Sequence, residues 1–414
     1  MLREVEVAKL SIGMFVAELD RPWLETPFPL QGFYVRSGEQ IRQLARFCQS
    51  VMVDPRRYDG RLAHAVRQAL PPAAETRQAE RRATRRSEAR LDVPVRQTRY
   101  EDTAEVEEEL PAAKRIIDAS ADSFRAFWDA LSARRKVTIG NLRSAVDPLV
   151  DSILRNKDAL VTLMRVQHLD RNTHEHCMAL AVWGSLLGRQ LGLPPEEIKT
   201  LALGCSLLDI GKVRLPKRML YKRGPLTPDE YAIVKSHVDY SLGMLGEVHG
   251  ADEAVISTVR WHHERMDGSG YPDGLRGAAI PMFARIAGIV DSYDAMISPR
   301  SYAPTCSSYE ALVELQDLCP ERFQSELVDQ FAQAIGLFPN GALVELSSGE
   351  VAVVCGQNPG RRLRPKVMVI LDSQKRKRSD LVIVDLTRLD EQQLRIAREL
   401  ARNEYGIDAA EYFL

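Results

Sequence analysis

Residues 262–275 read His-His-Glu-Arg-Met-Asp-Gly-Ser-Gly-Tyr-Pro-Asp-Gly-Leu, and this stretch carries more information about fold and function than any other part of the chain. Glycines at 268, 270 and 274, together with Pro272, predict a compact loop. Neighbouring side chains on a helix point about 100° apart. Two adjacent histidines that act together therefore predict a helix end, where the backbone can turn both rings inward.

Further metal-binding side chains surround this stretch. Six of the eight histidines fall between residues 170 and 305. Neutral imidazoles combined with carboxylates suit iron, manganese or zinc better than calcium. A lone helical histidine is more often a core or surface residue, so His64, His168, His174 and His249 are interpreted as surface residues. The candidate metal ligands, most of them in predicted helices or at their ends, are His176, His237, His262, His263, Asp209 and Asp291.

The same region, from about Thr173 to Gly341, closely resembles the HD-GYP family of cyclic di-GMP phosphodiesterases, a branch of the HD phosphohydrolase superfamily. Gly270-Tyr271-Pro272 is the tripeptide that gives the family part of its name. Residues 208–212 read Leu-Asp-Ile-Gly-Lys where the family has His-Asp-Ile-Gly-Lys. Residues 173–177, residues 226–237 and residues 289–295 resemble the segments that supply His176, His237 and Asp291 as ligands.

The resemblance implies two divalent metal ions, iron or manganese. One ion would draw on His176, Asp209, Asp291 and the histidine that Leu208 replaces. The other would draw on Asp209, His237, His262 and His263. Three protein ligands with water or substrate can still hold a catalytic metal, so we expect a weakened first site. Asn172 stands where some members carry a glutamate that binds a third metal, so we do not expect a trinuclear site.

One thiol near Leu208 offers an alternative ligand. Cys205 precedes Leu208 by one helical turn and could lend a thiolate, although packing is the favoured interpretation.

The resemblance also implies a reaction and its residues. The chain would hydrolyse cyclic di-GMP to the linear dinucleotide, and onward to GMP, in bacterial second-messenger signalling. Asp209 would bridge the metals, and Lys212 would contact the phosphate. The substrate side would be lined by Lys212, Arg265, Tyr271, Arg300 and Tyr302.

Two other functions stay open. With Leu208 disabling one metal, the domain could be a sensor of cyclic di-GMP, or an adaptor that binds a diguanylate cyclase (GGDEF) protein, without hydrolysis. An HD phosphohydrolase of another nucleotide is less favoured, because the Gly-Tyr-Pro loop marks one branch of the superfamily.

The fold class expected is mainly α, an HD-type helical bundle with smaller flanking parts. Residues 1–54 predict a small α+β module, which loosely resembles a domain of unknown function found ahead of HD-GYP domains. Residues 55–110 predict a charged linker with an arginine-rich run. Residues 111–340 predict the helical catalytic domain. Residues 341–414 predict a β-rich subdomain that ends in a helix from Glu391 to Asn403.

Composition limits the remaining options. The 414 residues are 45% hydrophobic and 27% charged, with a formal net charge of -1, which argues against general affinity for nucleic acid or acidic lipid. The six cysteines have no paired spacing and predict reduced thiols. The acidic N-terminus and the absence of a long apolar run predict a soluble cytoplasmic protein with no membrane partner. The N-terminal module could be a sensor, a protein dock or the interface of a homodimer.

Overall fold

The computed structural model describes most of the helical and C-terminal parts of the chain. The described residues are 3–11, 14–19, 33–35, 38–53, 98–166, 173–220, 222, 224, 226–247, 250–298, 306–358, 363–389, 394–400 and 404–412. The chain divides into two compact units, one of residues 1–91 with 359–363 and one of residues 92–358 with 364–414. The arginine-rich part of the predicted linker lies outside the described residues.

The first unit contains a four-stranded antiparallel sheet and one helix, in agreement with the predicted α+β module. The sheet has the order β1-β4-β2-β3. Val16, Leu44 and Val51 are buried together between the sheet and the helix. Strand β1 was not predicted because its sequence, Arg-Glu-Val-Glu, has a single apolar residue. The bounds are β1 (Arg3–Glu6), η1 (Val7–Lys9), β2 (Phe15–Leu19), β3 (Phe33–Tyr34), α1 (Gly38–Phe47) and β4 (Ser50–Val53).

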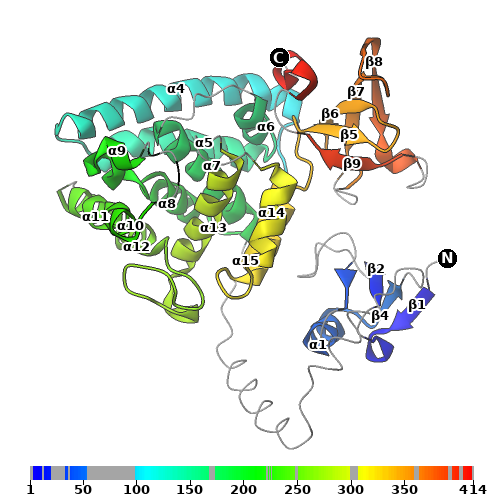
Figure 1. The fold of residues 1–414 in the computed structure, drawn as a ribbon, viewed down its shortest axis with the longest axis horizontal. Coiled ribbons are helices and arrows are strands. Elements are labelled where there is room, and N and C mark those ends of the chain that lie inside the picture. The colour runs from blue at the N-terminus through cyan, green and yellow to red at the C-terminus, as the bar shows by residue number, and fades with distance from the viewer. Residues whose placement is uncertain are drawn as a thin grey trace, which may run out of the picture. The chain divides into compact units, whose positions relative to one another are not determined.

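The helices of the second unit pack around α7 (Figure 1). Nearly every residue of this helix from Cys177 to Leu191 is buried, as expected for a helix that is apolar on all sides. Within the described residues, no helix is long and apolar enough to cross a membrane. The bounds are α4 (Val106–Ser132), α5 (Ile139–Arg155), α6 (Ala159–Val166), α7 (Thr173–Leu191), α8 (Pro195–Ser206), η3 (Ile210–Arg214), α9 (Lys217–Leu220), α10 (Pro228–Lys235), α11 (His237–Glu247), α12 (Glu253–Trp261), η4 (Gly277–Ala279), α13 (Met282–Ile297), α14 (Ser308–Asp317) and α15 (Ser325–Ile335).

The helical part begins earlier than residue 111. Helix α4 starts at Val106, and the residues just before it already contact the helices. The Tyr100 hydroxyl donates a hydrogen bond to the Leu193 carbonyl at 2.8 Å, and Arg189 pairs with Asp102 at 2.9 Å. Residues 98–105 therefore pack on the bundle instead of serving as a linker.

The C-terminal part is an antiparallel five-stranded sheet with the order β8-β7-β6-β5-β9. The predicted helix over Glu391–Asn403 is wrong, because residues 396–399 form a strand that pairs with β5. The Leu400 N–H donates to the Leu343 carbonyl at 2.8 Å, which extends this pairing. The bounds are β5 (Leu343–Leu346), β6 (Val351–Gly356), β7 (Lys366–Leu371), β8 (Lys377–Asp385), η5 (Leu386–Arg388), β9 (Ile396–Glu399), η6 (Glu404–Gly406) and η7 (Ala409–Tyr412).

The end of β9 is fastened to the helical part by a buried carboxylate, Glu399. One carboxylate oxygen lies 3.7 Å from the Arg165 guanidinium, and the other accepts the Tyr309 backbone N–H at 3.0 Å. Arg165 in turn donates to the Tyr293 hydroxyl at 3.0 Å and to the Ser308 hydroxyl at 2.6 Å. The sheet therefore contacts α6, α13 and α14 through one polar network.

Candidate metal centre

The structure brings the six expected metal ligands into two groups. The first, which we call the imidazole cluster, consists of His237, His262 and His263. The second, the carboxylate cluster, consists of His176, Asp209 and Asp291. In each group the ligand atoms lie within 4.8 Å of one another. Candidate metal ligands that are far apart in the sequence therefore lie close enough together to hold an ion.

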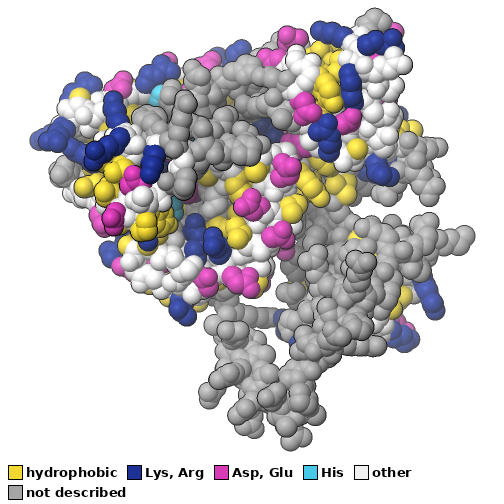
Figure 2. Space-filling model, viewed as in Figure 1, with side chains coloured by type: hydrophobic (Ala, Val, Ile, Leu, Met, Phe, Trp, Pro, Cys, Tyr) yellow, Lys and Arg dark blue, Asp and Glu magenta, His cyan; other side chains and the backbone are white. Residues whose placement is uncertain are grey.

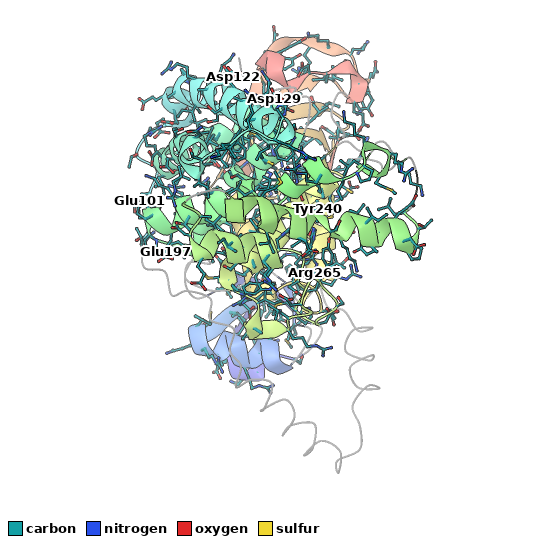
Figure 3. The ribbon with its side chains drawn as sticks, turned by 90° about the vertical axis from the view of Figure 1, so that its left-hand side faces the viewer. Glu101, Asp122, Asp129, Glu197, Tyr240 and Arg265 are labelled. Atoms are coloured by element: carbon teal, nitrogen blue, oxygen red, sulfur yellow. The ribbon has the colours of Figure 1, made fainter. Side chains whose placement is uncertain are left out.

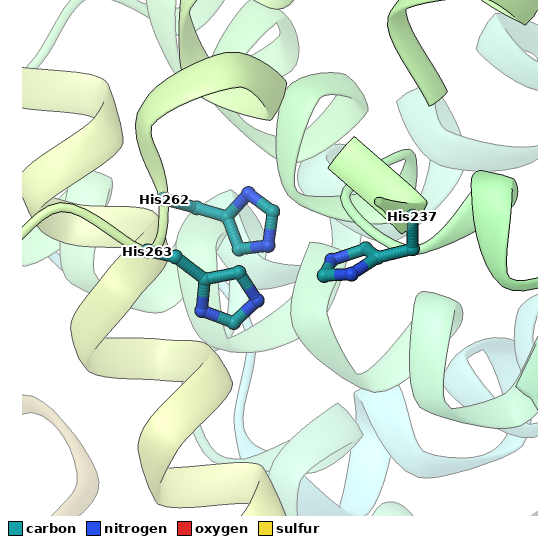
Figure 4. Close-up of side chains that lie close together, drawn as sticks. All are labelled: His237, His262 and His263. Carbon is teal, nitrogen blue, oxygen red and sulfur yellow. The ribbon is translucent and has the colours of Figure 1, made fainter. Parts of the chain in front are cut away.

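The imidazole cluster is built from two helix ends. His262 is the residue that ends α12 and His263 follows it, which confirms the helix end expected for the adjacent pair. His237 begins α11 directly after α10 ends, with Ser236 between the two helices. The three rings point toward one another (Figure 4), with centroids 4.0 to 5.7 Å apart.

Two of these rings present a lone pair to the centre of the cluster. The Nδ1 atoms of His237 and His262 each lie 2.7 Å from a backbone carbonyl, that of Val234 and that of Val259. Because a carbonyl oxygen only accepts, each Nδ1 carries the hydrogen and each Nε2 carries a lone pair. Both Nε2 atoms are buried without a hydrogen-bond partner in the described part of the chain. Buried polar atoms are normally paired, so these two fit a metal ion.

Burial also keeps two rings of the imidazole cluster neutral, those of His262 and His263. It lowers the pKa of His262 to about 4 and holds the pKa of His263 well below 6.5, with the neighbouring His262 adding to the effect. Imidazolium cannot bind a metal, whereas neutral imidazole can. At neutral pH these rings are ready ligands.

The carboxylate cluster is charged. His176 Nε2 lies 3.2 Å from Asp209 Oδ2 and 3.5 Å from Asp291 Oδ1. Its Nδ1 donates to Asp294 Oδ2 at 2.7 Å. Burial lowers the pKa of His176, but hydrogen bonds to the three carboxylates outweigh it and hold this pKa well above 6.5. Without an ion, the proton on His176 therefore compensates the carboxylates.

Asp209 belongs to the carboxylate cluster and also reaches the imidazole cluster. Its Oδ1 is 3.4 Å from His237 Nε2, and its Oδ2 is 3.2 Å from His176 Nε2. Lys212 Nζ also approaches Oδ2, at 2.5 Å. Burial raises the pKa of Asp209, yet Lys212 and the histidines hold it well below 3.8. An ionised carboxylate with one oxygen toward each cluster is the geometry of a bridging ligand.

Leu208 stands where the family has a histidine, and its side chain has no atom that can bind a metal. Its side chain is fully buried, and its carbonyl accepts the Ser241 hydroxyl at 3.2 Å. Cys205 lies against Gly184 of α7, and burial raises its thiol pKa strongly, which favours packing over a thiolate ligand. The carboxylate cluster therefore has one histidine fewer than the resemblance implies.

The Gly-Tyr-Pro loop is held against the imidazole cluster. The Glu264 carboxylate accepts three successive backbone N–H groups, from Asp273, Gly274 and Leu275. A Cβ at Gly270 would lie 2.5 Å from the His263 carbonyl, so only glycine fits there. Tyr271 then stacks on the His263 ring with centroids 4.6 Å apart. The loop thus places Tyr271 directly beside a candidate metal ligand.

Arg265, labelled in Figure 3, lies in the segment that follows α12. Its Nη1 donates to the carbonyls of His262 and Glu264 at 3.0 and 2.8 Å, and its guanidinium lies 4.9 Å from the Phe323 ring centroid. These contacts hold the backbone of the paired histidines. A contact of Arg265 with substrate stays a prediction.

Other expectations concern residues around the centre. Asn172, Arg300 and Tyr302 lie outside the described residues, as do His64, His168 and His249. His174 is half-buried, with a buried Nε2, so it is not the surface residue expected.

Sequence analysis missed two residues that support His176. Asp294 accepts the His176 Nδ1–H through one oxygen and the Trp183 indole N–H through the other, at 3.0 Å. Asp294 and Trp183 are both fully buried. The signal was present, since Asp294 follows Asp291 by three residues and therefore lies on the same helix face.

The comparisons with known proteins agree with this centre. A family model described as HD domain matches residues 148–327. A domain of unknown function, DUF3391, matches residues 2–142, and a KOW domain associated with HD domain matches residues 343–407. The three matches follow one another along the chain and together span most of it.

Curated proteins are similar to all or part of this chain. The cyclic di-GMP phosphodiesterase PA4108 of Pseudomonas aeruginosa is 30% identical over 389 residues, which is 94% of this chain and 90% of that protein. The response regulator RpfG of Xanthomonas campestris, a cyclic di-GMP phosphodiesterase, is 32% identical over 51% of this chain and 53% of its own. A 3'3'-cGAMP-specific phosphodiesterase 1 of Vibrio cholerae is 35% identical over 38% of this chain and 36% of its own. This chain belongs to the HD-GYP family of HD-domain phosphohydrolases, among relatives named as cyclic di-GMP phosphodiesterases.

Proposed function

We propose that this chain is a metal-dependent phosphodiesterase that hydrolyses cyclic di-GMP to the linear dinucleotide and onward to GMP. The observation that carries the proposal is the position of Asp209 between the two clusters, with one oxygen 3.4 Å from His237 and the other 3.2 Å from His176. Two ions that act on one phosphodiester must lie close together, and a carboxylate that binds both ions holds them there. Two independent metal sites would not need a shared carboxylate.

The ligand set favours a pair of transition-metal ions. The imidazole cluster with Asp209 would hold one ion, and the carboxylate cluster would hold the other. Imidazole and carboxylate together suit iron, manganese or zinc, and we propose iron or manganese. Such ions supply Lewis acidity and an activated water for phosphodiester hydrolysis.

The protein's own groups have separate tasks in this proposal. Asp209 stays ionised because Lys212 and the neighbouring histidines lower its pKa, so it is available as a ligand throughout. Lys212 Nζ is beside Asp209 Oδ2 and would place a positive charge next to a bound phosphate. Tyr271, stacked on His263, would limit the space beside the imidazole cluster and orient the substrate.

Leu208 gives the alternative function its physical basis. The carboxylate cluster has two carboxylates and one histidine, and the side chain at position 208 has no donor atom. A chain with only the imidazole cluster filled could bind cyclic di-GMP as a sensor or serve as an adaptor for a diguanylate cyclase, without hydrolysis. We favour the enzyme because His176, Asp209, Asp291 and Lys212 are all retained around the weakened site.

The names of the relatives favour a cyclic dinucleotide as substrate. Relatives from several bacteria are named as cyclic di-GMP phosphodiesterases, and two from Vibrio cholerae as 3'3'-cGAMP-specific phosphodiesterases. We place cyclic di-GMP first, because the relative that spans nearly the whole of this chain carries that name.

The test is hydrolysis by the full chain. Protein expressed in iron- or manganese-supplemented medium is incubated with cyclic di-GMP and, separately, with 3'3'-cGAMP, and products are separated by chromatography. We expect linear dinucleotide and GMP from cyclic di-GMP, and loss of both products after treatment with a chelator. Absence of product at every metal concentration, combined with tight binding of intact cyclic di-GMP, would establish the sensor instead.

A further inference from the structure

Beside the metal centre lies a group of three side chains, of which only Tyr271 has a task in the account above. It consists of Tyr231 and Lys235 on α10 and Tyr271 on the Gly-Tyr-Pro loop. Lys235 Nζ lies 4.6 Å from the Tyr231 ring centroid and 5.0 Å from that of Tyr271. The two rings meet edge to face with centroids 6.5 Å apart. We call this group the aromatic cluster.

The aromatic cluster is continuous with the metal centre. Tyr271 stacks on His263, with centroids 4.6 Å apart and planes 27° apart. Tyr231 and Lys235 lie four residues apart on α10, which places both on one helix face. A capping box formed by Thr227 and Glu230 fixes the start of this helix. The path from His263 through Tyr271 to Tyr231 therefore leads from the candidate metals to the surface.

The aromatic cluster is open to solvent at its outer end. Tyr231 is 45% exposed, although a ring that serves only the core would be buried. In Figure 2, hydrophobic side chains lie beside both basic and acidic side chains over the region of α10 and α11. Among the residues that the structure describes, no carboxylate pairs with Lys235. The ammonium group rests on two ring faces, which attract a cation without neutralising it.

We propose that the aromatic cluster is a nucleotide subsite, in which a purine base stacks on Tyr231 and Lys235 binds a phosphate oxygen. Exposed aromatic rings bind bases by stacking, and every base offers a face for it. A lysine without a counter-ion is a point charge suited to phosphate. The subsite takes its nucleotide, cyclic di-GMP, from the proposed function and adds the residues that would hold its base.

Equilibrium binding tests the subsite apart from catalysis. Full-length protein with the metals chelated is titrated with cyclic di-GMP and with GMP, by calorimetry, for the wild type and four variants. Tyr231→Ala is expected to weaken binding of cyclic di-GMP about tenfold, and Tyr231→Phe, which keeps the ring, by less than about twofold. Lys235→Ala is expected to weaken binding several-fold and to make it less sensitive to salt, whereas Lys235→Arg retains most of the affinity.

Matched controls lie elsewhere on the surface. Tyr240 on α11, labelled in Figure 3, is 44% exposed, and Lys114 is exposed on α4. Tyr240→Ala and Lys114→Ala should leave both affinities unchanged. In turnover assays of metal-loaded protein, the Tyr231→Ala loss should fall mainly on KM, as for a group that binds substrate and transition state alike.

Failure of the subsite and failure of the proposed function give different results. Wild-type affinity in Tyr231→Ala and Lys235→Ala, or no binding of either nucleotide to the wild type, overturns the subsite. Metal-dependent hydrolysis of bis(p-nitrophenyl) phosphate, which has no base, reports on the phosphodiesterase chemistry alone. Binding that depends on Tyr231 and Lys235 in a protein that hydrolyses no phosphodiester supports the subsite and overturns the enzyme.

Discussion

The imidazole cluster and the carboxylate cluster meet at Asp209, yet their polar atoms are satisfied in opposite ways. In the imidazole cluster, burial keeps the rings of His262 and His263 neutral, and the Nε2 atoms of His237 and His262 have no hydrogen-bond partner among the described residues. In the carboxylate cluster, His176 is within 3.5 Å of two carboxylates and holds a proton that compensates them. One cluster needs an ion to satisfy its atoms, whereas the other has a proton in its place.

The difference predicts an order of filling. A metal entering the imidazole cluster meets the neutral rings of His262 and His263, but a metal entering the carboxylate cluster must displace a proton from His176, because ligation requires the neutral ring. Leu208 removes a further ligand from the same cluster. We therefore expect the imidazole cluster to fill first and the carboxylate cluster to fill only at higher metal concentration.

The largest effect is expected from the residue that the clusters share. Asp209→Asn keeps the shape of the side chain but removes the negative charge that would bind both ions. Turnover of cyclic di-GMP should fall about a thousandfold, and elemental analysis should find at most one tightly bound ion per chain. Asp239→Asn, an exposed aspartate on α11, is the matched control. Two tightly bound ions in Asp209→Asn would mean that the clusters are independent.

Restoring the absent histidine should make the two clusters more alike. Leu208→His adds a nitrogen donor to the carboxylate cluster at a fully buried position. The affinity for the second ion should rise about 10–100-fold, the range by which changes around a metal site commonly act. Titration of the chelated protein with Mn²⁺, followed by the rate of hydrolysis, measures this. An unchanged titration curve would show that Leu208 is not what weakens the site.

A smaller effect, limited to one cluster, is expected from Asp294. Asp294→Asn offers one oxygen where His176 Nδ1–H and the Trp183 indole N–H each require an acceptor. The ring of His176 should lose its fixed orientation, and metal affinity of the carboxylate cluster should fall about tenfold. The ion in the imidazole cluster should stay bound. Trp183→Phe, which removes only the indole donor, should have a weaker effect, and equal loss from both clusters would contradict the assignment.

The smallest effect is expected on the pH dependence of the free energy of unfolding, and it comes from a residue of the helical bundle instead of from the clusters. Asp329 lies outside both clusters, and burial, with Glu326 nearby, raises its pKa to about 7. An acid whose pKa is higher in the folded state holds its proton more tightly when folded. Its contribution to the free energy of unfolding therefore falls as pH rises from about 4 to 7.

Replacement of Asp329 should remove this fall in the free energy of unfolding at higher pH. Asp329→Asn is expected to raise the free energy of unfolding at pH 8 by about 2 kcal/mol, measured by urea unfolding of the chelated protein. His262 and His263 act in the opposite direction, because burial lowers the pKa of each ring and protonation on acidification therefore destabilises the fold. In Asp329→Asn the free energy of unfolding should therefore rise between pH 4 and pH 7. In the wild type the opposite contribution of Asp329 partly cancels this rise.

Much of the fold could be predicted from local sequence. The helices α12, α13 and α15 and the strands β5 to β7 follow apolar periods that their burial satisfies. The segment at 391–403 misled because its Gln, Leu, Arg and Glu residues favour helix, while pairing of residues 396–399 with β5 gives a strand. Long-range pairing of this kind overrides local propensity and leaves no local signal.

The metal centre was predictable for a different reason. The adjacent pair His262 and His263 indicated a helix end from the sequence alone. The partnership of His176 with Asp209 was implied only by the resemblance to the family. Nothing in local sequence shows that Trp183 on α7 reaches Asp294 on α13, because that contact depends on how the helices pack. The same holds for Lys235, which is an ordinary helix lysine until Tyr271 is placed beside it.

The carboxylate at the end of β9 has a practical consequence for anyone who shortens this protein. Glu399 is buried against Arg165, which also holds Tyr293 and Ser308, and Tyr293 meets Trp183 edge to face. Removing the residues after α15 would leave Arg165 without the counter-charge of Glu399. Tyr293 and Trp183 connect Arg165 to Asp294, the residue that supports His176. A clone that stops at residue 340 is therefore a poor stand-in for the 414-residue chain.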